Sequence, residues 1–243
     1  MPARLDLASI AQLRSAVPTL SRVLRRENVA VIAEIKRSSP SKGAINSGID
    51  SGALAERYAA GGASAISVLT ESTRFGGSDN DIASVRLSVQ LPILKKDFHV
   101  TESQIAHAAV TGASAALVIV RAIRPSEIER LTTTARLAGI EIVYEVRDEN
   151  ELELALDCGA QMIGVNNRNL ESLEIDRTTV SRIVPLIPPE CIAIAESGYS
   201  SVEDIETAAE AGADAVLVGS FLSASDDPEE EVRRLSSVRS RKR

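Results

Sequence analysis

The chain has 243 residues, of which 44% are hydrophobic and 25% are charged, and its formal net charge is −7 at pH 7. This composition is typical of a globular protein and excludes a disordered chain, while the acidic balance counts against binding of nucleic acid. No apolar run approaches the roughly 20 residues that span a bilayer, so we expect no membrane partner. Asp6 and Arg14 interrupt the first apolar residues, which argues against a signal peptide.

The two cysteines, Cys158 and Cys191, and the two histidines lack the spacing of a zinc site or a disulfide framework. We interpret both cysteines as buried thiols and expect a reducing, cytoplasmic location. His99 and His107 are interpreted as surface or packing residues. Aromatic residues make up 2% of the chain, so the core has to be built from Ala, Val, Ile and Leu, as in parallel sheets covered by helices.

A fourfold repeat organises the chain. Gly62, Gly112, Gly159 and Gly212 each end a helical pattern and open a short apolar run, at intervals of about 50 residues. Further apolar runs between them complete eight predicted strands, at 29–35, 62–68, 92–96, 112–118, 141–145, 159–165, 192–196 and 212–218. Helical patterns follow the strands at 51–61, 79–89, 102–111, 125–138, 148–158, 178–186, 202–211 and 228–238.

Eight successive strand–helix units in a chain of this length predict an α/β protein with a (β/α)₈ fold, the TIM barrel. The alternative is an open, doubly wound sheet, which would need a G-x-G-x-x-G turn after the first strand, and none is present. Apolar residues at helical spacing, among them Leu13, Leu20 and Leu24, predict that the extension 1–28 contains a short helix capping the barrel or packing beside it. The basic tail 239–243 is expected to be a frayed, solvated end of this single domain, 1–243.

Charged residues are predicted at the carboxyl ends of the strands, where barrels of this class carry their catalytic groups. Glu34 and Lys36 end the first strand two positions apart, and so on the same face. Four other strands end in a polar side chain that would face the same cavity: Lys96, Glu145, Asn166 and Glu196. Burying an unpaired lysine or glutamate costs several kcal/mol, so a ring of two lysines and three glutamates indicates a functional site rather than a structural ion pair.

Small residues after the last two strands favour binding of a phosphate. Ser197-Gly198 and Gly219-Ser220 would let backbone N–H groups approach an anion. The long polar loop 37–43 after the first strand is either a mobile lid over the mouth or a solvated loop. Phe75, in the loop after the second strand, is either a packing residue or one wall of a ring-binding pocket.

Five segments carry a resemblance to a known family, in order and on the predicted strands. They are AEIKRSSPSKG at 33–43, LKKDF at 94–98, GVNNRNL at 164–170, AESG at 195–198 and LVGS at 217–220. From about residue 29 to residue 235 the chain resembles indole-3-glycerol-phosphate synthase. It departs from the family's pattern in its short N-terminal extension and in residues 221–227, which lack the usual Met-Arg after the eighth strand.

The resemblance implies ring closure of 1-(2-carboxyphenylamino)-1-deoxyribulose 5-phosphate to indole-3-glycerol phosphate, carbon dioxide and water. This is a step of tryptophan biosynthesis that needs no cofactor and no metal. The resemblance also implies that Lys96 is the general acid, that Lys36 holds the substrate carboxylate and that Glu145 transfers protons. The other implied positions are the positioning groups Glu34, Asn166 and Glu196, the substrate contacts Ser39, Phe75, Arg168, Ser197 and Leu217, and the phosphate contacts Gly198, Gly219 and Ser220.

The chemistry of these residues agrees with that reaction. An acid that protonates a carbonyl works best with a pKa near neutrality, and a partly desolvated Lys96 beside Lys36 is expected to have a lowered pKa. Three glutamates would stabilise the positive charge that ring closure builds on the indole precursor. We expect a monomer whose partner is a small phosphorylated substrate.

Three alternatives remain open at this stage. A phosphoribosyl isomerase on the same fold would use paired acids and bases, commonly Asp with Asp or Cys, but no Asp ends the first or sixth strand. A Schiff-base aldolase would use Lys96 as its nucleophile. A barrel that binds a sugar phosphate without this turnover would have no need of Lys36, Lys96 and Glu145 together.

Overall fold

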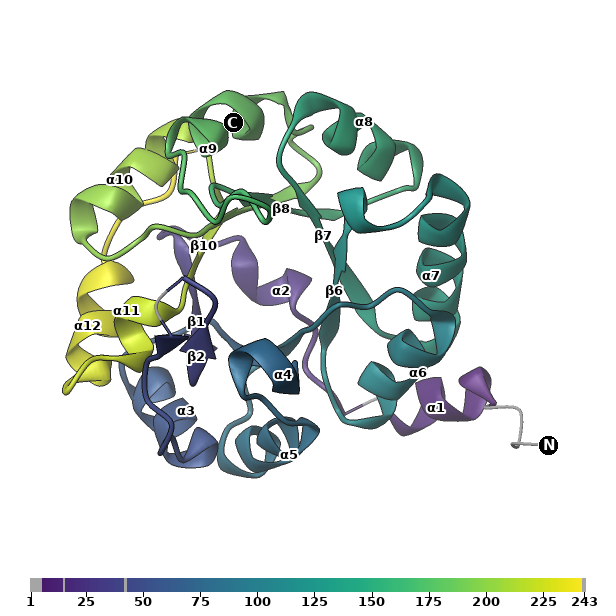
Figure 1. Ribbon diagram of the computed structural model, residues 1–243, viewed down its shortest axis with the longest axis horizontal. Helices are drawn as coiled ribbons and strands as arrows, with labels where there is room; N and C mark the ends of the chain where they lie inside the picture. Colours follow the sequence, from purple (N-terminus) through teal and green to yellow (C-terminus); the bar gives the residue numbers. More distant parts are fainter. Residues whose placement is uncertain (1–5, 15, 42, 242–243) are drawn as a thin grey trace.

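The computed structural model describes residues 6–14, 16–41 and 43–241, and it shows a closed barrel of eight parallel strands (Figure 1). The neighbours around the barrel follow the order β1-β10-β9-β8-β7-β6-β5-β4, and β1 closes the ring on β4. The strands are β1 (Ala30–Ile35), β4 (Ala65–Leu69), β5 (Ile93–Lys96), β6 (Ala115–Ile119), β7 (Glu141–Val146), β8 (Met162–Asn166), β9 (Ile192–Glu196) and β10 (Ala215–Val218). The predicted (β/α)₈ barrel is therefore confirmed, and the open sheet is excluded.

Helices surround the barrel on its outer side, as Figure 1 shows. They are α3 (Ser51–Ala60), α5 (Asp79–Ser88), α6 (Glu102–Val110), α7 (Pro125–Ala138), α8 (Glu149–Asp157), α9 (Thr178–Ile183), α10 (Val202–Ala211) and α12 (Pro228–Leu235), with short 3₁₀ turns at Val120–Ala122 and Val184–Leu186. The four repeat glycines all have positive φ, so each supplies the left-handed residue that its turn needs. Ser78, Thr101 and Ser201 form capping boxes that start three of these helices.

The interior of the barrel changes from apolar to charged along each strand. Inward positions recur every second residue, so Ile32 is followed by Glu34, Leu94 by Lys96 and Ile194 by Glu196. The apolar layer lies toward the amino ends of the strands and is buried. A second, larger apolar cluster fills the space between the strands and the helices. These two layers hold the charged ring in place at the carboxyl ends.

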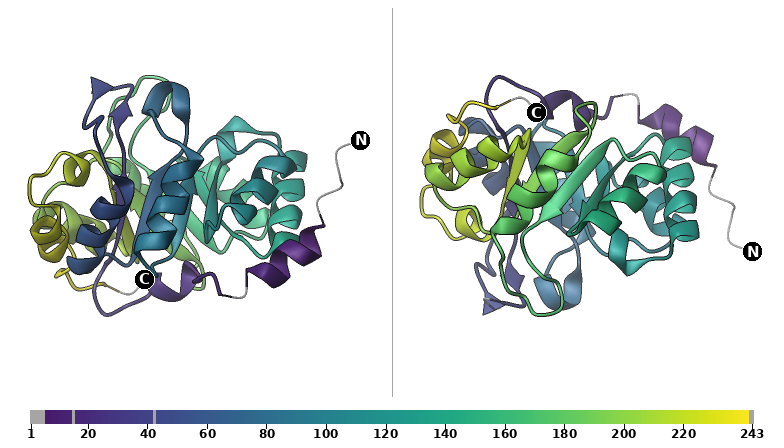
Figure 2. Two further views of the ribbon diagram at one scale, coloured as in Figure 1. Left: turned by 90° about the horizontal axis from the view of Figure 1, so that it is seen from below. Right: turned by 90° about the horizontal axis from the view of Figure 1, so that it is seen from above.

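The carboxyl ends of the strands carry additional short elements. The loop after β1 forms an antiparallel hairpin, β2 (Ser38–Ser39) with β3 (Gly43–Ala44). Helices α4 (Ser72–Phe75) and α11 (Ser220–Ser223) follow β4 and β10. Figure 2 shows β2 and α4 at one end of the barrel, opposite α2.

The described part of the extension before β1, residues 6–14 and 16–28, lies at the other end of the barrel and contains two helices rather than one, α1 (Leu7–Leu13) and α2 (Ser21–Leu24). Leu20 and Leu24 are fully buried within the inner apolar cluster, so α2 caps the amino ends of the strands as predicted. Leu13 is 85% exposed, so the prediction that it packs on the barrel together with Leu20 and Leu24 was wrong. Arg14 holds the extension instead, because its guanidinium donates to the carbonyls of Ala109, Ala113 and Gly139.

Two further expectations need correction. The part of the basic tail that the structure describes is docked rather than frayed: the Ser240 N–H donates to the Glu27 carbonyl at 2.9 Å, and Arg241 pairs with Glu210. Residues 242–243 of the predicted tail lie outside the described residues. Cys191 is buried as expected, but Cys158, at the carboxyl end of α8, is only half-buried.

The histidine predictions are confirmed. His99 is a buried packing residue whose Nδ1 lies 2.8 Å from the Leu117 carbonyl, and His107 lies at the surface against Asp79. Over residues 6–14, 16–41 and 43–241, no helix has the length and apolar character needed to cross a membrane.

Candidate active site

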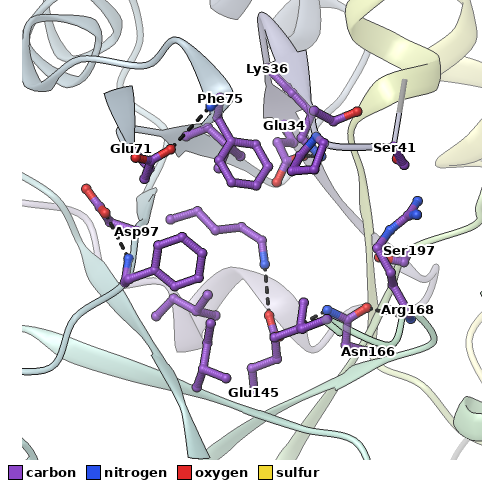
Figure 3. Close-up of a pocket in the computed structure, with 18 of the residues that line it drawn as sticks. Glu34, Lys36, Ser41, Glu71, Phe75, Asp97, Glu145, Asn166, Arg168 and Ser197 are labelled. Atoms are coloured by element: carbon purple, nitrogen blue, oxygen red, sulfur yellow. Dashed lines mark hydrogen bonds and ion pairs between the residues drawn. The ribbon is translucent and has the colours of Figure 1, made fainter. Parts of the chain in front are cut away.

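Every residue predicted for the site lines one of two adjoining cavities at the carboxyl ends of the strands. The cavities have volumes of about 120 and 220 Å³. Both are lined by Glu34, Lys36, Lys96, Arg168, Ser197 and Ser220, so they are continuous parts of one mouth. Figure 3 shows side chains from several strands and loops pointing into this space. The assembly requires the closed barrel, because these residues come from β1, β5, β7, β8, β9 and β10 and from the segments that follow β1, β4, β8, β9 and β10.

Lys96 lies at the centre of the charged ring, between two carboxylates. Its Nζ is 2.8 Å from Glu196 Oε2 and 3.1 Å from Glu145 Oε2. The side chain of Lys96 is 14% exposed, whereas Glu145 and Glu196 are 4% and 2% exposed. Lys96 therefore points into the mouth while the two carboxylates that hold it are almost completely removed from solvent.

The pKa of Lys96 is not lowered as the sequence suggested. Burial alone lowers it, but the negative charges of Glu145, Glu196 and Glu34 outweigh that effect and raise the Lys96 pKa above its ordinary value. The expectation failed because it counted desolvation and Lys36 but not the two carboxylates in contact. Lys96 is therefore protonated before the reaction starts, which is the state that a general acid requires.

Burial has the opposite effect on Glu196. Desolvation raises the pKa of this carboxyl, and the positive charge of Lys96 opposes the rise only in part. Glu196 thus has a protonation state that depends on its contact with Lys96.

A chain of hydrogen bonds links Glu145 to the loop after β8. Asn166 Nδ2 donates to Glu145 Oε1 at 3.0 Å, and Asn166 Oδ1 accepts from the Arg168 N–H at 2.9 Å (Figure 3). Arg168 Nη1 donates in turn to the carbonyl of Leu173 at 2.7 Å. This hydrogen bond orients the Glu145 carboxylate, so that Oε1 faces Asn166 and Oε2 faces Lys96.

Glu34 and Lys36 form a second ion pair beside the first. They lie on the same face at the end of β1, as their spacing predicted, and Lys36 Nζ is 2.5 Å from Glu34 Oε1. Glu34 is fully buried, whereas the Lys36 side chain is 17% exposed. With Lys96, the ring holds three glutamates and two lysines, arranged as two adjoining sets of ion pairs.

The predicted phosphate residues lie together at the side of the mouth next to β9 and β10. Ser197, Gly198, Gly219 and Ser220 line the same cavity, with Leu217 on its wall. Ser197 has φ 68°, a left-handed conformation that costs a non-glycine residue about 1–3 kcal/mol, and Gly198 has φ 91°. Strain of this kind is typical of functional loops.

The loop after β1 lines one side of the mouth and is anchored, so it is not merely solvated. Ser39 is buried and lines the cavity of about 120 Å³ together with Phe75. Arg37 holds the base of the hairpin: its guanidinium donates to both oxygens of Asp81, at 2.6 and 2.7 Å, and to the Ile49 carbonyl at 3.0 Å. Lys42, within the predicted lid, lies outside the described residues.

Several cavity residues were missed from the sequence. Phe98 lines the cavity on the side of β5, and Leu117 and Ile119 of β6 form part of its apolar wall. Phe98 stands inside the LKKDF segment and is one of three phenylalanines in the chain, a signal that could have singled it out. Leu117 and Ile119 carry no such signal, because an apolar inward residue looks the same whether it faces a core or a ligand.

Over the described ranges of the chain, no group of three or more His, Cys, Asp or Glu side chains is arranged to hold a metal ion. What the mouth offers instead is a lysine held by two carboxylates, a second lysine paired with Glu34, and a separate region of small residues after β9 and β10. A barrel with acid, base and anion-binding groups gathered at the carboxyl ends of its strands is an enzyme of the (β/α)₈ class.

Comparison with known proteins identifies the family. The family model described as Indole-3-glycerol phosphate synthase matches residues 3–235. A protein of Streptomyces griseus with that name is 50% identical over 212 residues, which cover 87% of this chain and 79% of that protein. A protein of Nocardioides sp. with that name is 44% identical over 249 residues, which cover 98% of this chain and 96% of that protein. This chain belongs to the indole-3-glycerol phosphate synthase family.

Among solved structures, thiamine phosphate pyrophosphorylase from Pyrococcus furiosus is similar, with a TM-score of 0.61 and 15% sequence identity. The match covers 92% of this chain and 95% of that one. At this identity the similarity shows the barrel fold alone.

Proposed function

We propose that Lys96, Glu145 and Lys36 carry out ring closure of 1-(2-carboxyphenylamino)-1-deoxyribulose 5-phosphate, the reaction of the family to which the chain belongs. The products are indole-3-glycerol phosphate, carbon dioxide and water, and the enzyme is a carboxy-lyase of tryptophan biosynthesis. The observation that carries the assignment of roles is the position of Lys96, held at 2.8 and 3.1 Å by two buried carboxylates at the mouth of the barrel.

Lys96 acts first, as the general acid. The aromatic ring carbon attacks the ribulose carbonyl, and Lys96 gives a proton to the carbonyl oxygen, which becomes a hydroxyl group. The attack places positive charge on the ring system, close to the Lys96 ammonium. A like charge nearby lowers the pKa of Lys96, so the proton is held firmly before the attack and released during it.

The carboxylates of the ring stabilise the cationic intermediate. Glu34, Glu145 and Glu196 are already in place around the cavity, so they need no reorganisation when the charge develops. Loss of carbon dioxide returns the electrons of the broken carbon–carbon bond to the ring. The new hydroxyl then leaves as water, with Glu145 moving the ring proton and Lys36 placed to assist the departure.

The remaining contacts orient the substrate. Lys36 binds the carboxylate that will leave, and Phe75 and Ser39 lie against the anthranilate ring. Arg168, Ser197 and Leu217 contact the substrate beside the phosphate, which Gly198, Gly219 and Ser220 receive. We propose a monomer whose partner is this small phosphorylated substrate. We also propose a cytoplasmic location, which the two cysteines without a disulfide framework support.

Product analysis tests the proposal directly. The chain is incubated with the carboxyphenylamino-deoxyribulose phosphate, and indole-3-glycerol phosphate and carbon dioxide are quantified by mass spectrometry. The control variant Arg136→Met is changed on the exposed face of α7. We expect it to form as much of each product as the parent chain does. Lys96→Met is expected to form neither. Product formation by Lys96→Met at the rate of the parent chain would contradict the role of Lys96.

A further inference from the structure

The carboxylate of Glu196 lies against a glycine of the neighbouring strand. Gly164 of β8 pairs in register with Ile194 of β9, and Glu196 stands two residues further on, on the same inward face. One oxygen of Glu196, Oε2, contacts Lys96 at 2.8 Å. The other, Oε1, is turned toward the backbone of Gly164.

A side chain at position 164 would occupy the place of that carboxylate. A Cβ built on Gly164 would overlap Glu196 Oε1 and would lie 3.3 Å from Glu196 Cδ and 3.3 Å from Val143 Cγ1. Gly164 does not have a positive φ, so its backbone conformation is open to other residues. The structure therefore requires glycine here for space and not for conformation.

The geometry points to Gly164 as a positioning residue for catalysis: the space left by its missing side chain seats the Glu196 carboxylate so that it holds Lys96. The inference rests on the proposed role of Lys96 as the general acid. Gly164 makes no contact with the reacting atoms and acts only through Glu196.

The fold and the site respond differently to a methyl group at this position. The end of a glutamate side chain is flexible, so Glu196 can swing aside, and Val143 has to give by a few tenths of an ångström. That movement takes the Glu196 carboxylate away from the Lys96 ammonium, which keeps its contact with Glu145 at 3.1 Å, so the fold loses less than when Lys96 itself is removed. Misplacement by about 1 Å in an active site can cost about 100-fold in rate.

The same arrangement recurs on the other side of the ring, which supports this interpretation. A Cβ on Gly219 would overlap Glu34 Oε1 and lie 3.0 Å from Glu34 Cδ. Glu34 and Glu196 are thus each seated against a glycine, whereas Glu145 is held by the side-chain amide of Asn166. Gly219 is less suited to a test, because it also belongs to the proposed phosphate site.

A double-mutant cycle tests the inference. The parent chain, Gly164→Ala, Glu196→Ala and the double variant are compared for kcat, KM and the melting temperature. We expect Gly164→Ala to lower kcat about 100-fold with little change in KM, and to lower the melting temperature less than Lys96→Met does. In the Glu196→Ala background the same substitution should cause no further loss, because the group through which it acts is absent. Gly48→Ala, at an exposed loop glycine whose added Cβ would meet only Asn46 Oδ1 at 3.9 Å, is the matched control and should retain parent kcat.

The outcomes separate this inference from the proposed function. The inference about Gly164 is overturned if Gly164→Ala leaves kcat unchanged. It is also overturned if the double variant loses kcat by the product of the two single losses. Neither result affects the proposed function. A Gly164→Ala chain that fails to fold also overturns it, because the inference holds that only the carboxylate has to move. Parent-level kcat in Glu196→Ala would overturn the role of Glu196 in the proposed function, and the positioning role of Gly164 with it.

Discussion

Replacing Lys96 by methionine removes one positive charge from between two buried carboxylates while nearly preserving side-chain length. Glu145 and Glu196 then keep their places, at 4% and 2% exposure, without the ammonium group that each contacts. Removing one partner of a buried ion pair costs about 3–5 kcal/mol, because the remaining charge is left uncompensated. Loss of a general acid lowers the rate by about 10²–10⁴-fold. We expect Lys96→Met to turn over at least about 100-fold more slowly than the parent chain and to be less stable at neutral pH.

The loss of stability in Lys96→Met should depend on pH, and the surroundings of Glu196 determine whether it grows or shrinks as the pH rises. Burial raises the pKa of Glu196, and the Lys96 charge opposes that rise, so removing Lys96 raises the Glu196 pKa further. A carboxyl with a folded-state pKa above its unfolded value binds a proton more tightly when folded. The stability that such a carboxyl contributes to the fold is present at low pH and is lost as the pH rises through its folded-state pKa. Lys96→Met should therefore lose less free energy of unfolding at pH 5 than at pH 8.

Urea unfolding followed by circular dichroism measures both values, with the parent chain at each pH as reference. A free energy loss of about 3 kcal/mol at pH 8 that shrinks by at least half at pH 5 agrees with the reasoning. A variant as stable as the parent at pH 8, or a loss independent of pH, would refute it. Either result would mean that the carboxylates are solvated or do not depend on Lys96.

Three other predictions concern separate parts of the molecule. Ser220→Asp should raise KM about tenfold or more in steady-state kinetics by repelling the substrate phosphate, and an unchanged KM would place the phosphate elsewhere. Arg14→Ala should lower the free energy of unfolding by about 2 kcal/mol, since three carbonyls lose their donor, while kcat stays at the parent value. A loss below about 0.5 kcal/mol would show that the extension is held by other contacts. Borohydride added with the substrate should trap no covalent adduct by mass spectrometry, whereas an adduct on Lys96 would indicate a Schiff-base aldolase.

The barrel and the members of its charged ring could be predicted from the sequence because both depend on local pattern. The four repeat glycines mark left-handed turns, and helix bounds such as 125–138 and 202–211 were predicted to the residue. Inward positions alternate along a strand, so Glu34 and Lys36 had to share a face. In a closed barrel all such faces converge on one mouth.

Properties that depend on contacts between distant segments could not be predicted in this way. The pKa of Lys96 was expected to fall and is instead raised, because its direction depends on Glu145 and Glu196, which come from strands far along the chain. The docking of the tail depends on Glu27 and Glu210, which no local pattern connects to it. The space at Gly164 depends on where the Glu196 side chain turns, which is a fact of packing and not of spacing.

Indole fluorescence on mixing the chain with the carboxyphenylamino-deoxyribulose phosphate tests the central claim most directly. The chain contains no tryptophan, so the protein contributes little background in this range. We predict a rising indole signal with the parent chain and none with Lys96→Met under the same conditions. The absence of a signal with the parent chain, while an unreactive phosphate analogue still binds tightly, would mean that the mouth binds the ligand without performing this chemistry.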